Sequence, residues 1–583
     1  YTENVDVNKD HLTIKSESGA EATIVQAADL DDHVFEVTAD YVNISGFTVK
    51  GAIGSRKAGI YLHNVNNCSI LDNIASNNYY GIYLHYSSNN TLTNNTMSEN
   101  DYNFGVSGYS LSNYIQNIDT TNKVDGKPIY YWINEQNKQI PNNAGYVGVV
   151  NSTNITVRDL TLTNNQGVLF AYTENSTIEN VTISSCDFGI YLRFSNKNNV
   201  SNNNILWTGN GIYLSDSSDN LISNNSVSKS GIGLYLGRSS NNTLIGNNMS
   251  GNAFNFGVDG HSFDHFSQII DTTNLVNGKP IYYLVNKHNV VVNSSSNAGY
   301  VGIINSSNVT VKDLTLTRNI QGVLFAYVDN SRIENVNAIN NRDGISLRNS
   351  FNNIIKNNIA SNNRDGIRLD DSFNNNIYLN NFIDNMYNVE SRGSTNIWNS
   401  TEPITYTYNG SQYTNYLGNY WSDYTGKDNN SDGIGDTPYI IDSDKDNYPL
   451  IKRFENYFVP TPSQIFDTGR PENPYPSISG KFVGTIRTNT KIIATKLYTY
   501  ACEGTGGHTE YALICNKTWC AYAEWKGYKG DWMNISFNRT VVLMPYETYN
   551  ITIVTGSYPQ IHHTHSLKTE NGWINCTEFT DAN

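Results

Sequence analysis

The sequence carries little charge, and most of that charge is negative. Charged residues make up 16% of the 583 residues, and the formal net charge is −15. A field of this sign repels phosphate backbones, which argues against a nucleic-acid partner. The chain also lacks an apolar run near the roughly 18 residues that a membrane-spanning helix requires, so we expect no membrane span.

Cysteine is rare, and four of the six residues fall in the C-terminal tail: Cys502, Cys515, Cys520 and Cys576. An even cluster in a compact tail predicts two disulfides and an oxidising location, with buried thiols as the alternative. N-x-S/T sequons are frequent and permit a glycosylated protein. The candidates are Asn89, Asn151, Asn241 and Asn534.

In place of helix-favouring residues the sequence has a 22-residue repeat rich in Asn, Ser and Gly. Each copy begins with Gly and an aliphatic residue, as in GIYLHYSSNNTLTNNTMSEN from Gly81. The third residue after the Gly is always Leu: Leu62, Leu84, Leu192, Leu214, Leu236, Leu347 and Leu369. Alternating aliphatic residues predict a strand with one buried face, and two further apolar bursts predict two more short strands per repeat.

Another position of the repeat is always Asn: Asn73, Asn95, Asn203, Asn225, Asn247, Asn358 and Asn380. Identical amides stacked along an axis can form a hydrogen-bonded ladder, and Asn tolerates the left-handed conformation that a corner needs. The opening Gly is predicted to mark another corner. Together these features predict an all-β parallel β-helix with about 22 residues per coil.

A longer period overlies the repeat. Residues 103–180 and 255–336 are a tandem duplication, and each copy contains GKPIYY, which we expect to form an excursion from the coil. The predicted organisation is a β-helix over 1–400, a cap with an acidic calcium-type loop over 401–458, a Pro-rich linker over 459–479 and a small β-sandwich with a Cys/His cluster over 480–583.

These motifs resemble a known family. The GIYL coils, the NGKPIYY segments and the closing GNYWSDYTGKDNNSDGIGDTPYIID resemble the NosD-type right-handed parallel β-helix proteins over about residues 1–455. This family, described as periplasmic copper-binding or carbohydrate-binding/sugar-hydrolase repeats, is abundant among surface proteins of methanogenic archaea, and the tail resembles an archaeal envelope module. The resemblance implies an extracytoplasmic location without fixing one activity. The coil sequences show no Met-rich or Cys-pair copper site.

An acidic segment near residue 430 has the alternating oxygen ligands and the Gly that open a calcium loop. The candidate ligands are Asp428, Asn430, Asp432, Ile434, Asp436, Asp442, Asp444 and Asp446. The bidentate Glu of a complete EF-hand is absent, since Tyr439 stands at the twelfth position. We expect calcium in a structural role that pins the cap to the last coil. A solvated acidic turn is the alternative.

A second metal candidate is a set of His residues in the tail. His508, His563 and His565 have a spacing that suits zinc or copper. Surface or hydrogen-bonded histidines are the alternative, and the sequence favours that interpretation.

The remaining candidates face outward from the coils. Tyr follows the Gly by two positions in five repeats: Tyr61, Tyr83, Tyr191, Tyr213 and Tyr235. This column either binds sugars or a partner, or merely stacks across rungs. Acidic and Arg residues gather on the last two coils: Arg342, Asp343, Arg348, Arg364, Asp365, Arg368, Asp370 and Asp371. Such a column can act on a polysaccharide, but paired surface charges are the favoured interpretation.

A further polar group consists of Asp259, His261, Asp264 and His265, which the first copy of the duplication replaces with Ser107, Tyr109, Ser112 and Asn113. We assign it no catalytic role.

We predict a secreted structural protein of the cell surface, without catalytic residues, that assembles with copies of itself into an envelope layer, sheath or filament. The reason is that the open ends of a solenoid present unpaired strand edges to another chain. The first alternative is an extracellular polysaccharide-binding or polysaccharide-cleaving β-helix protein. The second alternative is a copper- or zinc-handling accessory protein.

Overall fold

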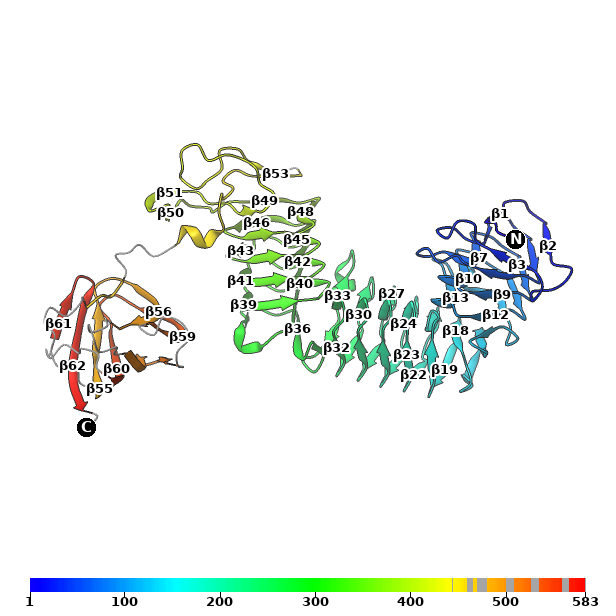
Figure 1. The fold of residues 1–583 in the computed structure, drawn as a ribbon, viewed down its shortest axis with the longest axis horizontal. Helices are drawn as coiled ribbons and strands as arrows, with labels where there is room; N and C mark the ends of the chain where they lie inside the picture. Colours follow the sequence, from blue (N-terminus) through cyan, green and yellow to red (C-terminus); the bar gives the residue numbers. More distant parts are fainter. Residues whose placement is uncertain are drawn as a thin grey trace. The chain divides into compact units, whose positions relative to one another are not determined.

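The computed structural model describes residues 1–442, 444–458, 465–468, 480–499, 508–525, 534–557 and 566–581. They form two compact units (Figure 1): unit 1 is Tyr1–Thr405 with Thr414–Phe454, and unit 2 is Tyr406–Tyr413 with Glu455–Asn583. Most of the predicted linker lies outside the described residues. Within these ranges the regular structure is almost entirely β-strand, and no helix is long and apolar enough to cross a bilayer.

Unit 1 is the predicted parallel β-helix. One coil runs through β7 (Ala58–His63), β8 (Ser69–Leu71) and β9 (Ile74–Ser76), and the next through β10 (Tyr80–His85), β11 (Thr91–Thr93) and β12 (Thr96–Ser98). Each strand pairs in parallel with its counterpart one coil on, so that Leu84 lies beside Leu62. The 22-residue period is therefore the length of one coil, as predicted.

The strands that carry the GIYL motif and their equivalents are called the front strands here. In the first part of unit 1 they are β1 (Val5–Val7), β4 (Phe35–Val37), β7, β10 and β13 (Tyr102–Ser107). In the second part they are β16 (Lys127–Ile133), β18 (Tyr146–Val150), β21 (Val168–Ala171), β24 (Phe188–Arg193), β27 (Asn210–Ser215), β30 (Ile232–Gly237) and β33 (Phe254–Asp259). In the third part they are β36 (Lys279–Val285), β38 (Tyr300–Ile304), β40 (Gln321–Ala326), β42 (Asp343–Arg348), β45 (Asp365–Asp370) and β48 (Tyr387–Arg392).

The interior of the coils is aliphatic, and the predicted Leu column is confirmed. All seven Leu residues at the third position after the Gly are fully buried. In the second part, Leu192, Leu214 and Leu236 follow one another in register on successive front strands. Burying a Leu side chain contributes about 1.5–3 kcal/mol, so every coil adds to a continuous core.

The predicted Asn ladder is present. The side-chain nitrogen of Asn203 donates to the side-chain oxygen of Asn225, and Asn225 donates in the same way to Asn247, each over 2.9 Å. A second ladder, not predicted, lies at another corner of the same coils. Its members are Asn198, Asn220, Asn242 and Gln268. At the corners, both ladders supply hydrogen bonds to backbone groups that the strands leave unpaired.

The corners differ from the prediction in two details. Left-handed backbone belongs to the residue before each ladder Asn, such as Asn224 with φ 53°, because the ladder Asn must turn its amide inward. The opening Gly is not at a corner. Gly211 lies inside β27, where a Cβ atom would sit 2.2 Å from a methyl carbon of Val227 and 2.5 Å from the carbonyl oxygen of Gly233. Close packing, rather than a turn, therefore requires glycine there.

Two hairpins change the direction of the coils. β15 (Lys123–Val124) pairs antiparallel with β16, and β35 (Leu275–Val276) pairs antiparallel with β36. The GKPIYY segments are therefore strands that open a new stack, not excursions as predicted. Each hairpin connects a different face of the preceding coils to the front strands of the following ones, so unit 1 bends at a first and a second elbow (Figure 1).

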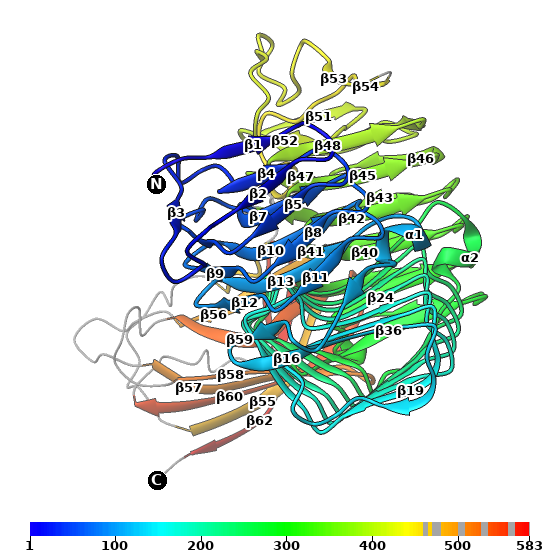
Figure 2. The same ribbon diagram turned by 90° about the vertical axis from the view of Figure 1, so that its right-hand side faces the viewer.

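Backbone hydrogen bonds close both elbows in the same way. At the first elbow, the amide of Gln166 donates to the carbonyl of Phe104 over 3.1 Å. At the second, the amide of Ile320 donates to the carbonyl of Phe256 over 2.9 Å. Next to the two elbows lie the one-turn helices α1 (Leu111–Tyr114) and α2 (Phe263–Phe266), which project from the same side of unit 1 in Figure 2. The duplication seen in the sequence is thus a duplicated elbow.

Unit 2 is all-β, and its described strands after residue 479 form one antiparallel sheet curved into a half-barrel rather than two separate sheets. In sheet order the strands are β56 (Ile492–Tyr498), β59 (Asn534–Leu543), β58 (Cys520–Glu524), β57 (His508–Cys515), β60 (Thr548–Ser557), β55 (Gly480–Thr488), β62 (Gly572–Asp581) and β61 (Ser566–Thr569). A small core around Phe482, Ile514 and Tyr549 fills its concave side.

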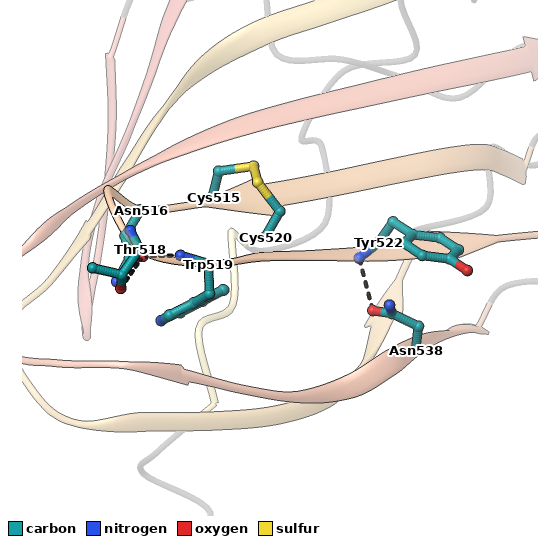
Figure 3. The surroundings of a disulfide bond; sticks show 7 residues. All are labelled: Cys515, Asn516, Thr518, Trp519, Cys520, Tyr522 and Asn538. Carbon is teal, nitrogen blue, oxygen red and sulfur yellow. Dashed lines mark hydrogen bonds between the residues drawn. A yellow bond between two sulfur atoms is a disulfide. The ribbon is translucent and has the colours of Figure 1, made fainter. Parts of the chain in front are cut away.

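One of the predicted disulfides is confirmed. Cys515 and Cys520 are bonded across the hairpin that joins β57 to β58 (Figure 3). The turn between them is held by the Asn516 side chain, which accepts hydrogen bonds from the backbone amides of Thr518 and Trp519. Cys576 forms no disulfide within the described part of the chain, and Cys502 lies outside it.

Candidate functional site

The front strands carry the polar side chains of unit 1 on their outer face. Because side chains alternate along a strand, the second and fourth residues after the Gly point outward while the Ile and Leu point inward. The parallel register then stacks these outward residues into columns. In the third part of unit 1 the columns become charged: Arg348 lies beside Asp370, and Asp370 beside Arg392.

The second elbow brings an aspartate from one stack of coils to arginines of the next. Asp259, at the end of β33, lies 3.5 Å from Arg342 and 3.4 Å from Arg348, measured between carboxylate oxygen and guanidinium nitrogen. Arg342 also lies 3.3 Å from Asp343. We call the whole group the second-elbow cluster, which consists of Asp259, Arg342, Asp343, Ser346, Arg348, Asp365, Arg368 and Asp370.

The predicted pairing of charges within the last coils is also present. Arg348 binds the Asp370 carboxylate, and the Nε atom of Arg368 lies 3.1 Å from the same carboxylate. These pairs differ from ordinary surface pairs because several members are buried. Arg348 is 5% exposed, Asp365 is 1% exposed, and the Asp343 side chain is not exposed at all.

Several buried polar atoms of the cluster lack a hydrogen-bond partner in this structure. They are the Ser346 hydroxyl, the Nε and Nη2 atoms of Arg348 and both carboxylate oxygens of Asp365. Of these, the Nη2 atom of Arg348 makes the 3.4 Å ion-pair contact with Asp259. Asp365 has only longer ion-pair contacts, 3.8 Å to Arg368 and 3.9 Å to Arg364. Buried polar groups are almost always hydrogen-bonded, so this concentration on two adjacent coils indicates a place that takes up water or a polar ligand.

The surroundings of Asp365 and Asp259 shift the pKa values of the two carboxyl groups in opposite directions. Burial, reinforced by the neighbouring Asp343, raises the pKa of Asp365 to about 6 despite Arg364 and Arg368. Burial also acts to raise the pKa of Asp259, but the guanidinium groups of Arg348, Arg342 and Arg368 outweigh it and lower that pKa overall. Asp365 can therefore carry a proton near neutral pH, whereas Asp259 stays ionised.

A second group of converging side chains lies on the first coils. His63 and His85 occupy the same position on β7 and β10, and their Nδ1 atoms are 3.3 Å apart. The Tyr61 hydroxyl lies 3.1 Å from the Nδ1 of His63 and 2.7 Å from that of His85. Burial and the neighbouring His63 lower the pKa of His85 to about 4, while burial and Glu36 raise the pKa of Tyr61 to about 12.

The sequence carries a signal for this His pair that was not among the predicted sites. GIYLH occurs in two successive repeats and in no other copy of the motif, and in-register parallel pairing places the two His side chains on adjacent rungs. In the other repeats the same position holds residues such as Arg193, Ser215 and Gly237.

The predicted Tyr column is divided by the first elbow into two shorter ones. Tyr61 and Tyr83 stack at 5.9 Å between ring centroids, and Tyr191, Tyr213 and Tyr235 follow one another at 5.5 and 5.2 Å. Neighbouring rings cover the faces of these tyrosines; for example, Phe188 stacks on Tyr191. The arrangement favours cross-rung stacking and leaves mainly ring edges and hydroxyl groups outside.

The predicted calcium loop folds around its own backbone. Asp428 accepts hydrogen bonds from the amides of Asp432 and Gly433, and Asp432 accepts one from the amide of Ile434. Asp436 accepts from the backbone and side chain of Asn429. Within the part of the chain that is described, no three His, Cys, Asp or Glu side chains gather closely enough to hold a metal ion. Calcium binding in this loop stays a prediction.

The other predicted calcium ligands have different surroundings. Asp444 accepts a hydrogen bond from the indole nitrogen of Trp398, and Asp446 accepts one from that of Trp421 at 3.0 Å. Asp446 is fully buried and also accepts from the amide of Asn419, the last amide of an Asn ladder. Both carboxylates therefore fasten the cap to the last coil directly. Asp442 is exposed in the turn between β53 (Tyr439–Ile441) and β54 (Asp444–Asp446).

The remaining predicted sites fall in different places. His563 and His565 lie outside the described residues, and His508 begins β57. Near α2, the Nδ1 atom of His265 accepts hydrogen bonds from the amides of His261 and Ser262, so this His caps a turn. Three of the sequon residues are exposed on the coils and the fourth is half-buried in β59: Asn89, Asn151, Asn241 and Asn534.

Comparison with known proteins identifies one family. The family described as "Periplasmic copper-binding protein (NosD)" matches residues 2–144, 109–282 and 250–426. No curated protein matches the chain.

Similar solved structures include ORF18 of Geobacillus virus E2, with 14% identity and a TM-score of 0.21. The alignment covers 47% of this chain and 50% of that chain. A tailspike protein mutant of E. coli bacteriophage HK620, solved in complex with a pentasaccharide, has 11% identity and a TM-score of 0.24, with 96% and 82% of the two chains covered. The A-module of a mannuronan C-5 epimerase from Azotobacter vinelandii has 12% identity and a TM-score of 0.15, with 67% and 83% covered. Similarities this weak carry no information about a ligand.

Proposed function

The chain belongs to the NosD family, and we propose that it is an extracytoplasmic, surface-located β-helix protein that binds a polysaccharide at its second elbow. The observation that supports this proposal is the concentration, on Ser346, Arg348 and Asp365, of buried polar atoms that make no hydrogen bond. Saccharide hydroxyls both donate and accept hydrogen bonds, as this mixture of hydroxyl, guanidinium and carboxyl groups requires.

The exposed members of the cluster set the mode of binding. Asp259 is 25% exposed and Arg342 is 22% exposed, so these two side chains contact the ligand first. Ordered water can connect the ligand to the deeper Ser346 and Arg348, since bridging waters are nearly as favourable as direct hydrogen bonds. The cluster holds carboxylates beside its guanidinium groups, which favours a neutral or weakly acidic sugar over a strongly anionic one.

In this proposal the second-elbow cluster binds the polysaccharide without cleaving it. Asp365 has the raised pKa that a general acid needs, but Asp365 and its neighbour Asp343 are both closed to solvent. A glycosidic oxygen must reach the acid within hydrogen-bond distance, which the burial of both carboxyl groups prevents.

The test uses the full chain and a panel of neutral, uronate-containing and sulfated polysaccharides in affinity electrophoresis. Ser346→Tyr places in the cluster the residue that the second part of the β-helix carries at the same position, as at Tyr191, and is expected to abolish retardation. Arg332→Gln removes an exposed arginine from another face of the same coils and serves as the control. Retention of binding by Ser346→Tyr contradicts the proposal. If incubation of the protein with a polysaccharide produces new reducing ends, the protein cleaves it. That result contradicts only the statement that binding occurs without cleavage.

Self-assembly is a second proposal, supported by unpaired edges. Among the described residues, β1 and β2 (Thr13–Lys15) lie at the ends of their sheets, whereas β3 (Ile24–Gln26) is bridged by Thr2. Such edges pair readily with another chain. Light scattering over a wide concentration range tests this idea, and a particle that stays monomeric at the highest concentration contradicts it.

A further inference from the structure

Two imidazoles and a phenol converge on one point of the first coils, and no part of the polysaccharide proposal uses them. His63, His85 and Tyr61 are half-buried. They project from two adjacent front strands whose register is fixed by the pairing of Leu62 with Leu84. The convergence is therefore a property of the coil and not of a flexible loop.

The distances suit a metal ion. Two nitrogens bound to one tetrahedral ion at about 2.0–2.1 Å lie about 3.3 Å apart. The Nδ1 atoms of His63 and His85 are separated by 3.3 Å, and the Tyr61 oxygen is 3.1 Å from the first of them. The 2.7 Å contact between Tyr61 and His85 is that of a hydrogen bond, so a small movement of the hydroxyl accompanies metal entry.

Without a metal ion, one choice of tautomers lets these groups hydrogen-bond to one another. The Nδ1–H of His63 then donates to the Tyr61 oxygen, and the Tyr61 hydroxyl donates to the Nδ1 of His85. A metal ion would take the place of these hydrogen bonds, and the three donor atoms are already close together before it binds.

Neighbouring rings hold the ligands in place. His33 stacks on Tyr61 at 4.2 Å between centroids, and its Nδ1 accepts a hydrogen bond from the amide of Ala58. On the other side, Tyr86 packs against His85 at 3.9 Å. These ring contacts restrict the orientations that Tyr61 and His85 can adopt.

We propose that His63, His85 and Tyr61 form a binding site for one transition-metal ion, with Cu²⁺ preferred. Two imidazoles and an oxygen are a donor set that copper and zinc accept, and affinity for such sites peaks at Cu²⁺ among the divalent first-row metals. These residues fit the metal named in the description of the family, although nothing in that description assigns them. Solvent completes the coordination shell, since three protein donors leave at least one position open.

The experiment is a titration of the full chain with Cu²⁺, followed by electron paramagnetic resonance and visible absorption. The wild-type protein is expected to bind Cu²⁺ with nitrogen hyperfine coupling, and His63→Gln/His85→Gln is expected to lose this signal. Tyr61→Phe is expected to keep a nitrogen-coordinated signal but lose any phenolate-to-copper absorption band. Zn²⁺ is expected to compete only in large excess.

Two control variants make the result decisive. His288→Gln changes an exposed His elsewhere on the β-helix and is expected to leave the titration unchanged. His563→Gln/His565→Gln removes two of the four His residues of the tail, the pair with the His-x-His spacing. If Cu²⁺ binding survives in His63→Gln/His85→Gln, or disappears only in the tail variant, the proposal is wrong. Far-ultraviolet circular dichroism establishes that each variant keeps the β-helix, so loss of binding cannot be ascribed to unfolding.

Discussion

The Tyr80 hydroxyl donates a hydrogen bond of 2.5 Å to the carboxylate of Asp187, although 107 residues separate them in the chain. Tyr80 belongs to a front strand before the first elbow, and Asp187 immediately precedes β24 after it. Tyr80 is almost fully buried, and burial raises the pKa of Asp187. The bond therefore fastens two stacks of coils to one another at the inside of the bend.

Removal of this hydroxyl is predicted to weaken the first elbow. Tyr80→Phe leaves the Asp187 carboxylate without its donor, at an expected cost of about 1–3 kcal/mol in the free energy of unfolding. Denaturant titration measures the loss of unfolding free energy. Amide hydrogen exchange should become faster in residues 80–104 and 164–190. Tyr41→Phe, which alters an exposed tyrosine, is the control. Equal stability of the two variants contradicts the role given to Tyr80.

A break in the Asn ladder is predicted to be more costly. Asn225 donates to the carbonyl of Val200 and to Asn247, and it accepts from Asn203. Asn225→Ala leaves several of these buried groups unpaired, so we expect a loss of about 3 kcal/mol in unfolding free energy. Ser226→Ala, at an exposed position of the next strand, should change stability by less than about 0.5 kcal/mol. A small effect of Asn225→Ala would show that water replaces the ladder.

The stability of the first coils is predicted to fall in mild acid. Burial and, after it, the nearby Lys57 lower the pKa of His33 from 6.5 to about 4. The Nδ1 atom of His33 also accepts a hydrogen bond from the amide of Ala58, which protonation of that atom would break. Between these values the unfolded chain binds more protons than the folded one, so stability rises with pH. It is complete above about pH 6.5 and is lost as the pH falls toward 4, by up to about 3 kcal/mol.

Comparison with His33→Gln isolates this contribution, since carboxyl groups also titrate in the lower part of the window. Gln can accept the hydrogen bond from Ala58 without a titratable group. Unfolding free energies measured at pH 7 and pH 5 should differ more for the wild-type protein than for the variant. An identical difference for both proteins would assign the acid sensitivity to other groups.

Reduction of the disulfide is predicted to affect unit 2 alone. The bond between Cys515 and Cys520 closes a short loop, for which chain entropy gives about 2 kcal/mol of stabilisation. Dithiothreitol should lower the denaturant midpoint of unit 2 and leave that of the β-helix unchanged. Cys515→Ser/Cys520→Ser should already show the lower midpoint and respond no further to reductant. A shift in the β-helix transition would indicate that the two units unfold together.

Features that recur in every coil were predictable from the sequence. Leu192, Leu214 and Leu236, or Asn203, Asn225 and Asn247, are separated by a constant interval, and a constant interval in a chain that pairs in register means vertical neighbours. The same rule would have revealed His63 above His85. Where the period is kept, local sequence is enough to place a side chain.

Features that depend on the elbows were not predictable in this way. GKPIYY has the composition of a loop, and its role follows only from the antiparallel pairing of β15 with β16. The pairing of Asp259 with Arg348 joins coils on opposite sides of a bend, so no sequence period relates them. The acidic neighbours of Asp446 in the sequence suggested a metal ligand. In the structure its carboxylate instead accepts a hydrogen bond from the indole of Trp421.

The duplicated elbow makes the geometry of the protein modular. Whole 22-residue coils can be inserted or deleted midway between the two hairpins without disturbing either bend, because the strands of a coil there pair only with those of its immediate neighbours. Each added coil would lengthen the segment between the bends by about 4.8 Å, the spacing of strands in a sheet. Relatives with different numbers of coils would then differ in the distance between their two elbows. The number of repeats would set the size of a partner that fits between the bends.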